Sequence, residues 1–142
     1  MAVTAEQRRI VAQRARHCCE YCQSQLRFSV DSFSVEHIVP CSRGGTHDLA
    51  NFGLACQRCN NHKFTATQAP DPLTGEMASL FHPREQSWHE HFLWSHEYLF
   101  IRGLTPTGRA TVERLQLNRS SLVNLRRVLV AAGEHPPIDT TE

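Results

Sequence analysis

Two C-x-x-C pairs, Cys19-Glu20-Tyr21-Cys22 and Cys56-Gln57-Arg58-Cys59, enclose 33 residues in the first half of the chain. Each pair can fold as a short knuckle that presents two sulfurs to one ion, and two such pairs are typical of a tetrahedral zinc–thiolate site. The insert is longer than that of a simple zinc ribbon, so we expect a folded element within it. We predict that a structural Zn²⁺ is held by Cys19, Cys22, Cys56 and Cys59.

Two other interpretations of these cysteines are weaker. Buried small apolar residues or a redox dithiol each account for one C-x-x-C pair, but two pairs favour a metal site. Within the first pair, Cys18 competes with Cys19, because Cys18 and Cys22 would form a C-x3-C knuckle. We predict Cys19, because the two-residue spacing is then the same at both ends of the insert.

Length, composition and charge indicate one small protein without a membrane span. The chain has 142 residues and a net charge of +1, a length typical of one domain. It contains no run of about 18 apolar residues, and its first residues lack an apolar signal segment, so we expect a cytoplasmic location. The charge is uneven: residues 1–63 hold eight basic and five acidic side chains, whereas residues 64–142 hold seven and nine.

The order of patterns in the first half predicts part of an α+β fold. Thr4 and Gln7 match the T-x-x-Q capping box that begins a helix. An alternating segment rich in β-branched residues predicts a strand that ends before Pro40. The elements expected here are a helix over 4–17, strands over 32–39 and 51–55, and a helix over 60–66. The insert between the cysteine pairs therefore has the order strand, loop, strand, helix.

The second half has a different character and no cluster of metal-binding residues. A turn-rich connector at 70–75 precedes a hairpin with strands over 91–95 and 98–102, and apolar residues at helical spacing predict helices over 105–115 and 120–132. We expect residues 1–69 to form the zinc-bound core with its N-terminal helix. Residues 70–142 would then be an extension that packs on this core.

Four short motifs follow one another in and directly after the insert between the cysteine pairs. They are Glu36-His37-Ile38-Val39-Pro40, Gly44-Gly45, Asn51, and Cys59-Asn60-Asn61-His62-Lys63. Together with the C-x-x-C pairs, this string resembles the zinc-containing branch of the HNH endonuclease family over residues 16–63. The later half is similar to the extension of some small stand-alone bacterial HNH proteins. The resemblance implies a ββα-metal core, also called a His-Me finger.

The candidate catalytic residues also make chemical sense for hydrolysis of a phosphodiester. An imidazole with an ordinary pKa of about 6.5 can accept a proton near neutral pH, which suits His37 as the base that activates water. The carboxylate of Glu36 and the amide of Asn60 are hard oxygen ligands that suit one Mg²⁺ or Mn²⁺. Lys63 lies one helical turn after Asn60 and would face the same side to contact the phosphate. The resemblance implies these same roles, and assigns Asn51 to orient the loop that carries His37.

Three features of this site depart from the simplest expectation. Neighbouring residues on a strand point to opposite faces, so Glu36 and His37 need a local bend to approach one point. The residue before the base is most often Asp or His in the family, whereas this chain has Glu36. His62 is an alternative to Asn60 as the last metal ligand, although it is rotated by roughly 200° around the helix.

The implied activity is nicking or cleavage of DNA that leaves 5′-phosphate and 3′-hydroxyl ends, with RNA as another substrate. A ββα finger would lie along the minor groove, where base readout is degenerate, so we expect low sequence specificity. Phosphate contacts are expected from Arg8, Arg14, Arg16 and Arg43. Two other functions fit the same residues: a zinc-stabilised nucleic-acid-binding module without catalysis, and a defence or toxin nuclease recruited by a protein that binds the C-terminal half.

Overall fold

The N-terminal helix packs along a small two-stranded sheet. The computed structural model describes residues 2–138. Helix α1 (Ala5–Arg14) begins at Thr4 with the expected capping box, in which the Thr4 hydroxyl and the Gln7 side chain bond each other's backbone N–H. The helix ends three residues earlier than predicted, because Arg16 and His17 adopt positive φ angles of 55° and 57°, which no α-helix accommodates.

The insert contains two antiparallel strands followed by a helix, in the expected order. β1 (Ser34–His37) pairs with β2 (Phe52–Ala55) so that Glu36 lies opposite Gly53 and His37 opposite Phe52. α2 (Gln57–Lys63) begins earlier than the predicted 60–66, because Cys56 caps it: its Sγ accepts the backbone N–H of Cys59. The second cysteine pair is therefore part of the helix start. Short 3₁₀ turns occur at Leu26–Phe28, Cys41–Arg43 and Leu49–Asn51.

The predicted connector at 70–75 is the turn of a hairpin that the sequence did not indicate. β3 (Gln68–Pro70) pairs with β4 (Met77–Ser79), and the Asp71 carboxylate organises the turn by accepting bonds from Leu73 and Thr74. The same carboxylate accepts two hydrogen bonds from Arg109, at 2.9 and 2.8 Å. This ion pair attaches the hairpin to the helix that contains Arg109.

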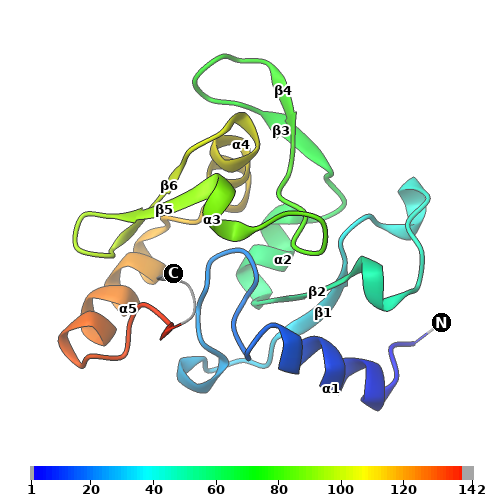
Figure 1. Cartoon of the computed structure of the whole chain (residues 1–142), viewed down its shortest axis with the longest axis horizontal. Coiled ribbons are helices and arrows are strands. Elements are labelled where there is room, and N and C mark those ends of the chain that lie inside the picture. The colour runs from blue at the N-terminus through cyan, green and yellow to red at the C-terminus, as the bar shows by residue number, and fades with distance from the viewer. Residues whose placement is uncertain (1, 139–142) are drawn as a thin grey trace.

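The C-terminal half contains the expected hairpin and two helices, together with a short helix that was not predicted. These elements are α3 (Trp88–His91), β5 (Phe92–Ser95), β6 (Phe100–Gly103), α4 (Pro106–Leu115) and α5 (Ser120–Ala131). Gly108 lets α4 approach α3, because a Cβ at this position would lie 2.0 Å from the carbonyl oxygen of His91. α2 lies between the β1–β2 pair and α4 (Figure 1).

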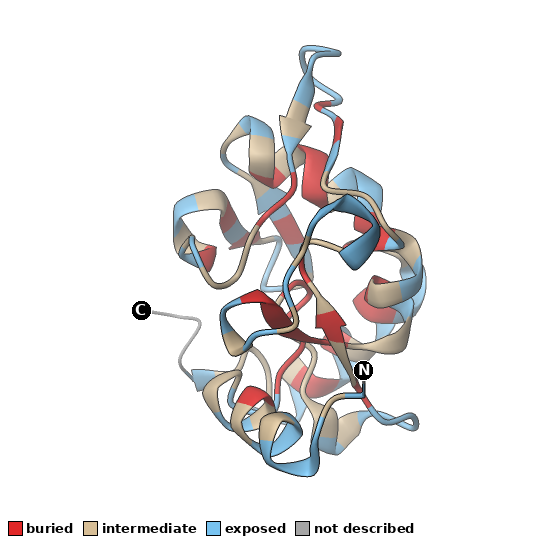
Figure 2. Ribbon diagram, turned by 90° about the vertical axis from the view of Figure 1, so that its right-hand side faces the viewer, coloured by how far each residue is buried: buried red, intermediate tan, exposed pale blue. Residues whose placement is uncertain are grey.

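One continuous hydrophobic core joins the two halves. From the first half it contains Tyr21, Phe52 and three of the four paired cysteines, with Cys56 packed against it. From the second half it contains Trp88, Phe92 and Leu115. Buried residues run along the middle of the molecule, with exposed residues on the outer helical faces and at the hairpin tip (Figure 2). The proposed boundary between residues 69 and 70 lies inside β3. Among the described helices, none has the length and apolarity needed to cross a bilayer.

Candidate functional site

Four cysteine sulfurs converge where β2 meets α2. The Sγ atoms of Cys19, Cys22, Cys56 and Cys59 all lie within 4.8 Å of one another. Cys56 is half-buried and the other three are buried. The thiol of Cys18 points elsewhere and donates to the carbonyl oxygen of Arg16 at 3.5 Å, so Cys19 is the member of the cluster. Four soft sulfur donors at this spacing fit a tetrahedral metal such as Zn²⁺, which would connect the N-terminal knuckle to α2.

An arginine from the second half contacts this cluster. The guanidinium of Arg119 lies 3.4 Å from the Sγ of Cys56 and 3.6 Å from that of Cys59, within reach for N–H···S bonds. It also donates to the carbonyl oxygens of Leu115 and Gln116 at the end of α4. A cation beside thiolates offsets their negative charge and orients them as an outer shell of a metal site does. This contact could not be predicted from local sequence patterns, because 60 or more residues separate the partners.

Glu36 is part of a buried ion pair, and its carboxylate is not open to solvent. Its Oε1 accepts a 2.8 Å hydrogen bond from the Tyr21 hydroxyl and lies 3.2 Å from Nζ of Lys63. Nζ of Lys63 also donates to the carbonyl oxygen of Ile38 at 2.8 Å. Burial raises the pKa of Glu36, although Lys63 and Tyr21 both favour its charged form.

This arrangement differs from the roles predicted for both residues, which stay predictions. Lys63 is only 1% exposed, so its ammonium does not reach a phosphate on the surface. A divalent cation at Glu36 would have to displace the ammonium or sit beside it, and two neighbouring cations repel. Both contacts are made by Oε1 of Glu36, and they compete with the expected Mg²⁺ or Mn²⁺ at this carboxylate. The ion pair instead fastens β1 to α2.

The strand register explains why Glu36 and His37 do not meet. Each residue of β1 pairs with one residue of β2 in unbroken sequence, so the bend that the prediction required is absent from this strand. Glu36 consequently points inward to Tyr21 and α2, whereas the ring of His37 packs on Phe52, its partner across the strands. The predicted convergence of these two side chains is not observed.

The remaining predicted metal ligands lie on α2. Asn60 is half-buried, and its side chain makes no hydrogen bond within residues 2–138. His62 is on a basic side of the helix: Arg114 donates to its carbonyl oxygen at 3.0 Å. Burial lowers the pKa of His62, and so do the positive charges of Arg119, Arg58 and Arg114. Those charges make His62 a poor ligand for a further cation.

His37 is paired with a histidine that the sequence analysis did not assign to the site. Its Nε2 lies 3.0 Å from Nδ1 of His47, which is a hydrogen-bond distance. Both rings meet Phe52 edge to face, with centroids 5.1 Å from that ring. Burial lowers the pKa of His37, and the neighbouring His47 lowers it further. His47 follows Gly44-Gly45-Thr46 in the loop between the strands, but no spacing rule marks that position.

Asn51 holds both segments that carry these histidines. Its Oδ1 accepts the backbone N–H of Val39 at 2.9 Å, and its Nδ2 donates to the carbonyl oxygens of Val39 and Thr46 at 2.9 and 2.8 Å. Gly45 is required beside this amide, because a Cβ there would lie 1.7 Å from the carbonyl oxygen of Val39. Asn51 thus connects the end of β1 to the loop that precedes His47.

The predicted arginine contacts separate into exposed and structural residues. The Nη2 of Arg14 donates to the carbonyl oxygens of Leu49 and Phe52 at 2.6 and 2.5 Å, so this guanidinium has a structural role besides the predicted phosphate contact. Arg8, Arg16 and Arg43 are exposed. Arg43 uses Nε to bond the carbonyl oxygen of Thr65, so its position is fixed.

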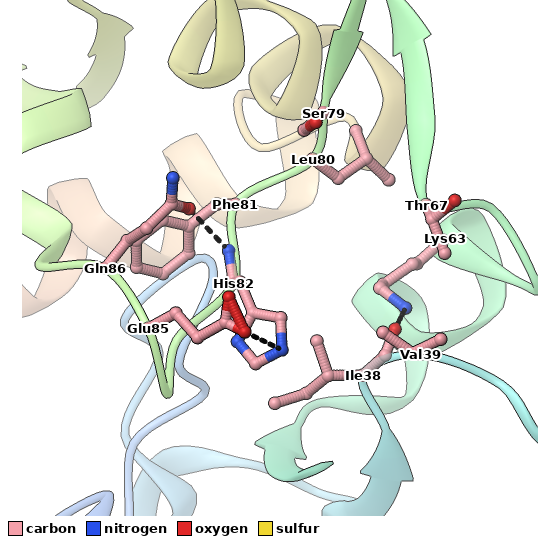
Figure 3. A pocket seen from close by; sticks show the side chains of 10 residues that line it. All are labelled: Ile38, Val39, Lys63, Thr67, Ser79, Leu80, Phe81, His82, Glu85 and Gln86. Carbon is pink, nitrogen blue, oxygen red and sulfur yellow. Dashed lines mark hydrogen bonds and ion pairs between the residues drawn. The ribbon is translucent and has the colours of Figure 1, made fainter. Parts of the chain in front are cut away.

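A cavity of about 260 Å³ opens at the end of β1, away from His37. Figure 3 shows Lys63 reaching Ile38 on one wall, with His82, Glu85 and Gln86 on the other. Its lining includes neither Glu36 nor His37 nor Asn60. The cavity belongs to the junction of the two halves and is separate from the histidine pair.

These features define a small domain with four cysteines that could hold a metal ion and a strand, strand, helix arrangement in which Asn51 fixes the backbone after His37. The family model of the HNH endonucleases matches residues 19–65, so this segment is similar to HNH endonuclease domains. The match includes both cysteine pairs, His37, Asn51 and Asn60. No curated protein and no solved structure gave a significant match.

Proposed function

We propose that the chain is a nuclease that hydrolyses phosphodiester bonds of DNA, with His37 as the general base. The observation that carries this proposal is the placement of His37 in the HNH segment. One ring nitrogen lies 3.0 Å from Nδ1 of His47; the other makes no hydrogen bond within residues 2–138, and His37 is partly exposed. Its lowered pKa keeps the imidazole neutral near pH 7 and able to accept a proton.

In the proposed reaction, His37 takes a proton from a water molecule while the water oxygen attacks phosphorus. The new P–O bond forms as the bond from phosphorus to the 3′ oxygen breaks, and that oxygen takes a proton from solvent. The products carry a 5′-phosphate and a 3′-hydroxyl. Asn51 contributes by fixing the backbone after His37, and the Glu36–Lys63 pair contributes by holding β1 against α2.

The charge of the first half favours a nucleic acid as the substrate, and the family match makes DNA the proposed one. Residues 1–63 carry eight basic and five acidic side chains, and Arg8, Arg16 and Arg43 are exposed there. Phosphate contacts of this kind position a protein without reading sequence, so we expect low sequence specificity and strong dependence on salt. We further propose that β1, β2 and α2 form the ββα-metal core and that residues 70–142 act as its packed extension.

A plasmid-nicking assay tests this function. Purified protein is incubated with supercoiled plasmid in EDTA, Mg²⁺ or Mn²⁺, and the ends are characterised enzymatically, with a structured RNA as a parallel substrate. We expect open-circular plasmid with Mg²⁺ or Mn²⁺ and none in EDTA, because HNH domains use divalent metals; this requirement comes from the family and not from a metal site in this structure. Intact plasmid under all three conditions would contradict the proposal.

A binding module without catalysis is the second candidate, because one observation favours it. The carboxylate expected to bind a divalent cation is occupied by Lys63 and Tyr21. Such a module would shift DNA in a salt-sensitive gel-retardation experiment and leave the plasmid intact with every metal. The two assays together therefore separate the two functions.

A further inference from the structure

The contact between His37 and His47 has two chemically different forms. If His37 donates through Nε2, its Nδ1 keeps a lone pair that faces solvent. If His47 donates through Nδ1, then neutral His37 carries its proton on Nδ1 and has no free lone pair. The 3.0 Å distance fits either direction. Which histidine donates therefore decides whether His37 can act as a base at all.

His47 is held in place by the same residue that fixes the end of β1. The Asn51 amide bonds the carbonyl oxygen of Thr46, directly before His47, and both backbone polar groups of Val39. Both imidazoles also meet the ring of Phe52 edge to face, and Phe52 is fully buried. The histidine contact is therefore built into the fold and does not depend on the free movement of a surface loop.

Keeping a histidine at position 47 has a cost in stability. Nε2 of His47 is buried and has no hydrogen-bond partner within the described part of the chain. A buried polar group without a partner is unfavourable whichever tautomer it adopts. A phenylalanine would pack on Phe52 equally well without this cost. The contact between Nδ1 of His47 and His37 therefore explains why a histidine stands at position 47.

We propose, on the basis of the proposed nuclease function, that His47 is a positioning residue for His37: its Nδ1 accepts the Nε2–H of His37 and leaves the Nδ1 lone pair of His37 exposed to water. When His37 takes a proton from water on Nδ1, the Nε2–H of the resulting imidazolium continues to donate to His47. His47 thus selects the reactive tautomer before the reaction and stabilises the imidazolium during it. A neutral acceptor is sufficient for both roles.

The tautomer of His37 can be measured without any activity. In protein labelled with ¹⁵N in histidine, ring-nitrogen chemical shifts at about pH 8 distinguish a protonated from an unprotonated nitrogen, where a histidine of ordinary pKa is neutral. The His37→Ala variant assigns the signals. We expect neutral His37 to carry its proton on Nε2. A proton on Nδ1 would overturn the proposal, whatever the protein does to DNA.

Two substitutions at position 47 separate packing from hydrogen bonding. His47→Phe keeps the ring but removes the acceptor, whereas His47→Asn removes the ring and keeps an acceptor oxygen near the position of Nδ1. We expect His47→Phe to reduce the nicking rate at least about tenfold while its thermal midpoint is unchanged or higher, and His47→Asn to restore part of the rate. Wild-type nicking by His47→Phe would overturn the positioning role and leave the proposed function intact. Absence of nicking by the wild type would refute the proposed function, and the NMR measurement would still decide the direction of the hydrogen bond.

Discussion

At the scale of single residues, the environment of His37 suits proton transfer near neutral pH. Its ring packs on Phe52 and contacts His47, and both burial and the neighbouring histidine disfavour a positive charge. The pKa of His37 is therefore below the ordinary value of 6.5. A base with this property remains unprotonated at pH values where an exposed histidine is already charged.

The pH dependence of cleavage follows from this shift. Only neutral His37 can accept a proton, so the rate should fall as the pH decreases through its lowered pKa. We expect the midpoint of this acid limb below pH 6.5, measured as single-turnover nicking between pH 5 and 8. Circular dichroism at each pH checks that the protein stays folded. A midpoint at or above 6.5 would show that a different group controls the reaction.

At the scale of structural elements, a buried ion pair and an arginine hold the HNH segment together. The Glu36–Lys63 pair joins β1 to α2, and Arg119 joins the start of α5 to the cysteine cluster. Each contact connects elements that are distant in sequence. Replacing one residue of such a contact should therefore weaken the packing between the two elements that it joins. The loss of stability should be larger when the remaining partner is a buried charge without its counter-charge.

A double-mutant cycle tests the role of Glu36. Glu36→Gln or Lys63→Met alone leaves a buried charge without its partner, so each should destabilise the protein by about 3–5 kcal/mol in urea unfolding. The double variant should regain much of this stability, because neither charge remains. It should also retain nicking, since Glu36 is structural in this account. A folded double variant without activity would instead assign Glu36 to the cation.

Arg119 offers a second test at the same scale. Arg119→Met keeps an apolar stem but removes the N–H groups that contact Cys56 and Cys59. We expect zinc to be lost to a competing chelator at about tenfold lower chelator concentration, as for other outer-shell partners of metal sites. Arg127→Met is the matched control, because Arg127 lies on α5, which Arg119 precedes, and its side chain bonds Asn124 rather than a cysteine. Equal zinc retention in both variants would show that the Arg119 contact is unimportant.

Local sequence patterns predicted most helices and strands. Features that depend on contacts between distant residues could not be predicted in this way. The capping box at Thr4 and the order of β1, β2 and α2 were predictable because each depends on nearby residues, and the cysteine cluster was predictable because the two-residue spacing repeats in both pairs. The β3–β4 hairpin was missed, because its three-residue strands are stabilised by the distant Arg109. The partners of Glu36 were missed for the same reason: Tyr21 and Lys63 lie 15 and 27 positions away, on other elements.

At the scale of the whole molecule, the cysteine cluster lies inside a core shared by both halves. A metal held there connects the N-terminal knuckle, α2 and, through Arg119, the second half of the chain. The shared core implies that the halves unfold together, because neither buries its apolar surface alone. Structural zinc contributes directly to folding free energy in sites of this kind.

Loss of one thiolate should therefore affect the whole chain. We expect Cys56→Ser to lose zinc and either to unfold or to melt at a much lower temperature in one transition. Cys41→Ser is the control, since Cys41 is exposed and outside the cluster. Zinc content by elemental analysis and a calorimetric melt provide the measurements. A Cys56→Ser protein with a normal melting temperature would argue against a structural metal.

The nicking rate of the His37→Ala variant tests the proposed nuclease most directly. Single-turnover cleavage of supercoiled plasmid is compared between this variant and the wild type at equal zinc content and equal thermal stability, with His96→Ala as a control at a histidine outside the HNH segment. We expect His37→Ala to cut at least about 100-fold more slowly and His96→Ala to cut normally, because general-base catalysis contributes at this scale. Nicking by His37→Ala at the wild-type rate would contradict the assignment of His37 as the base.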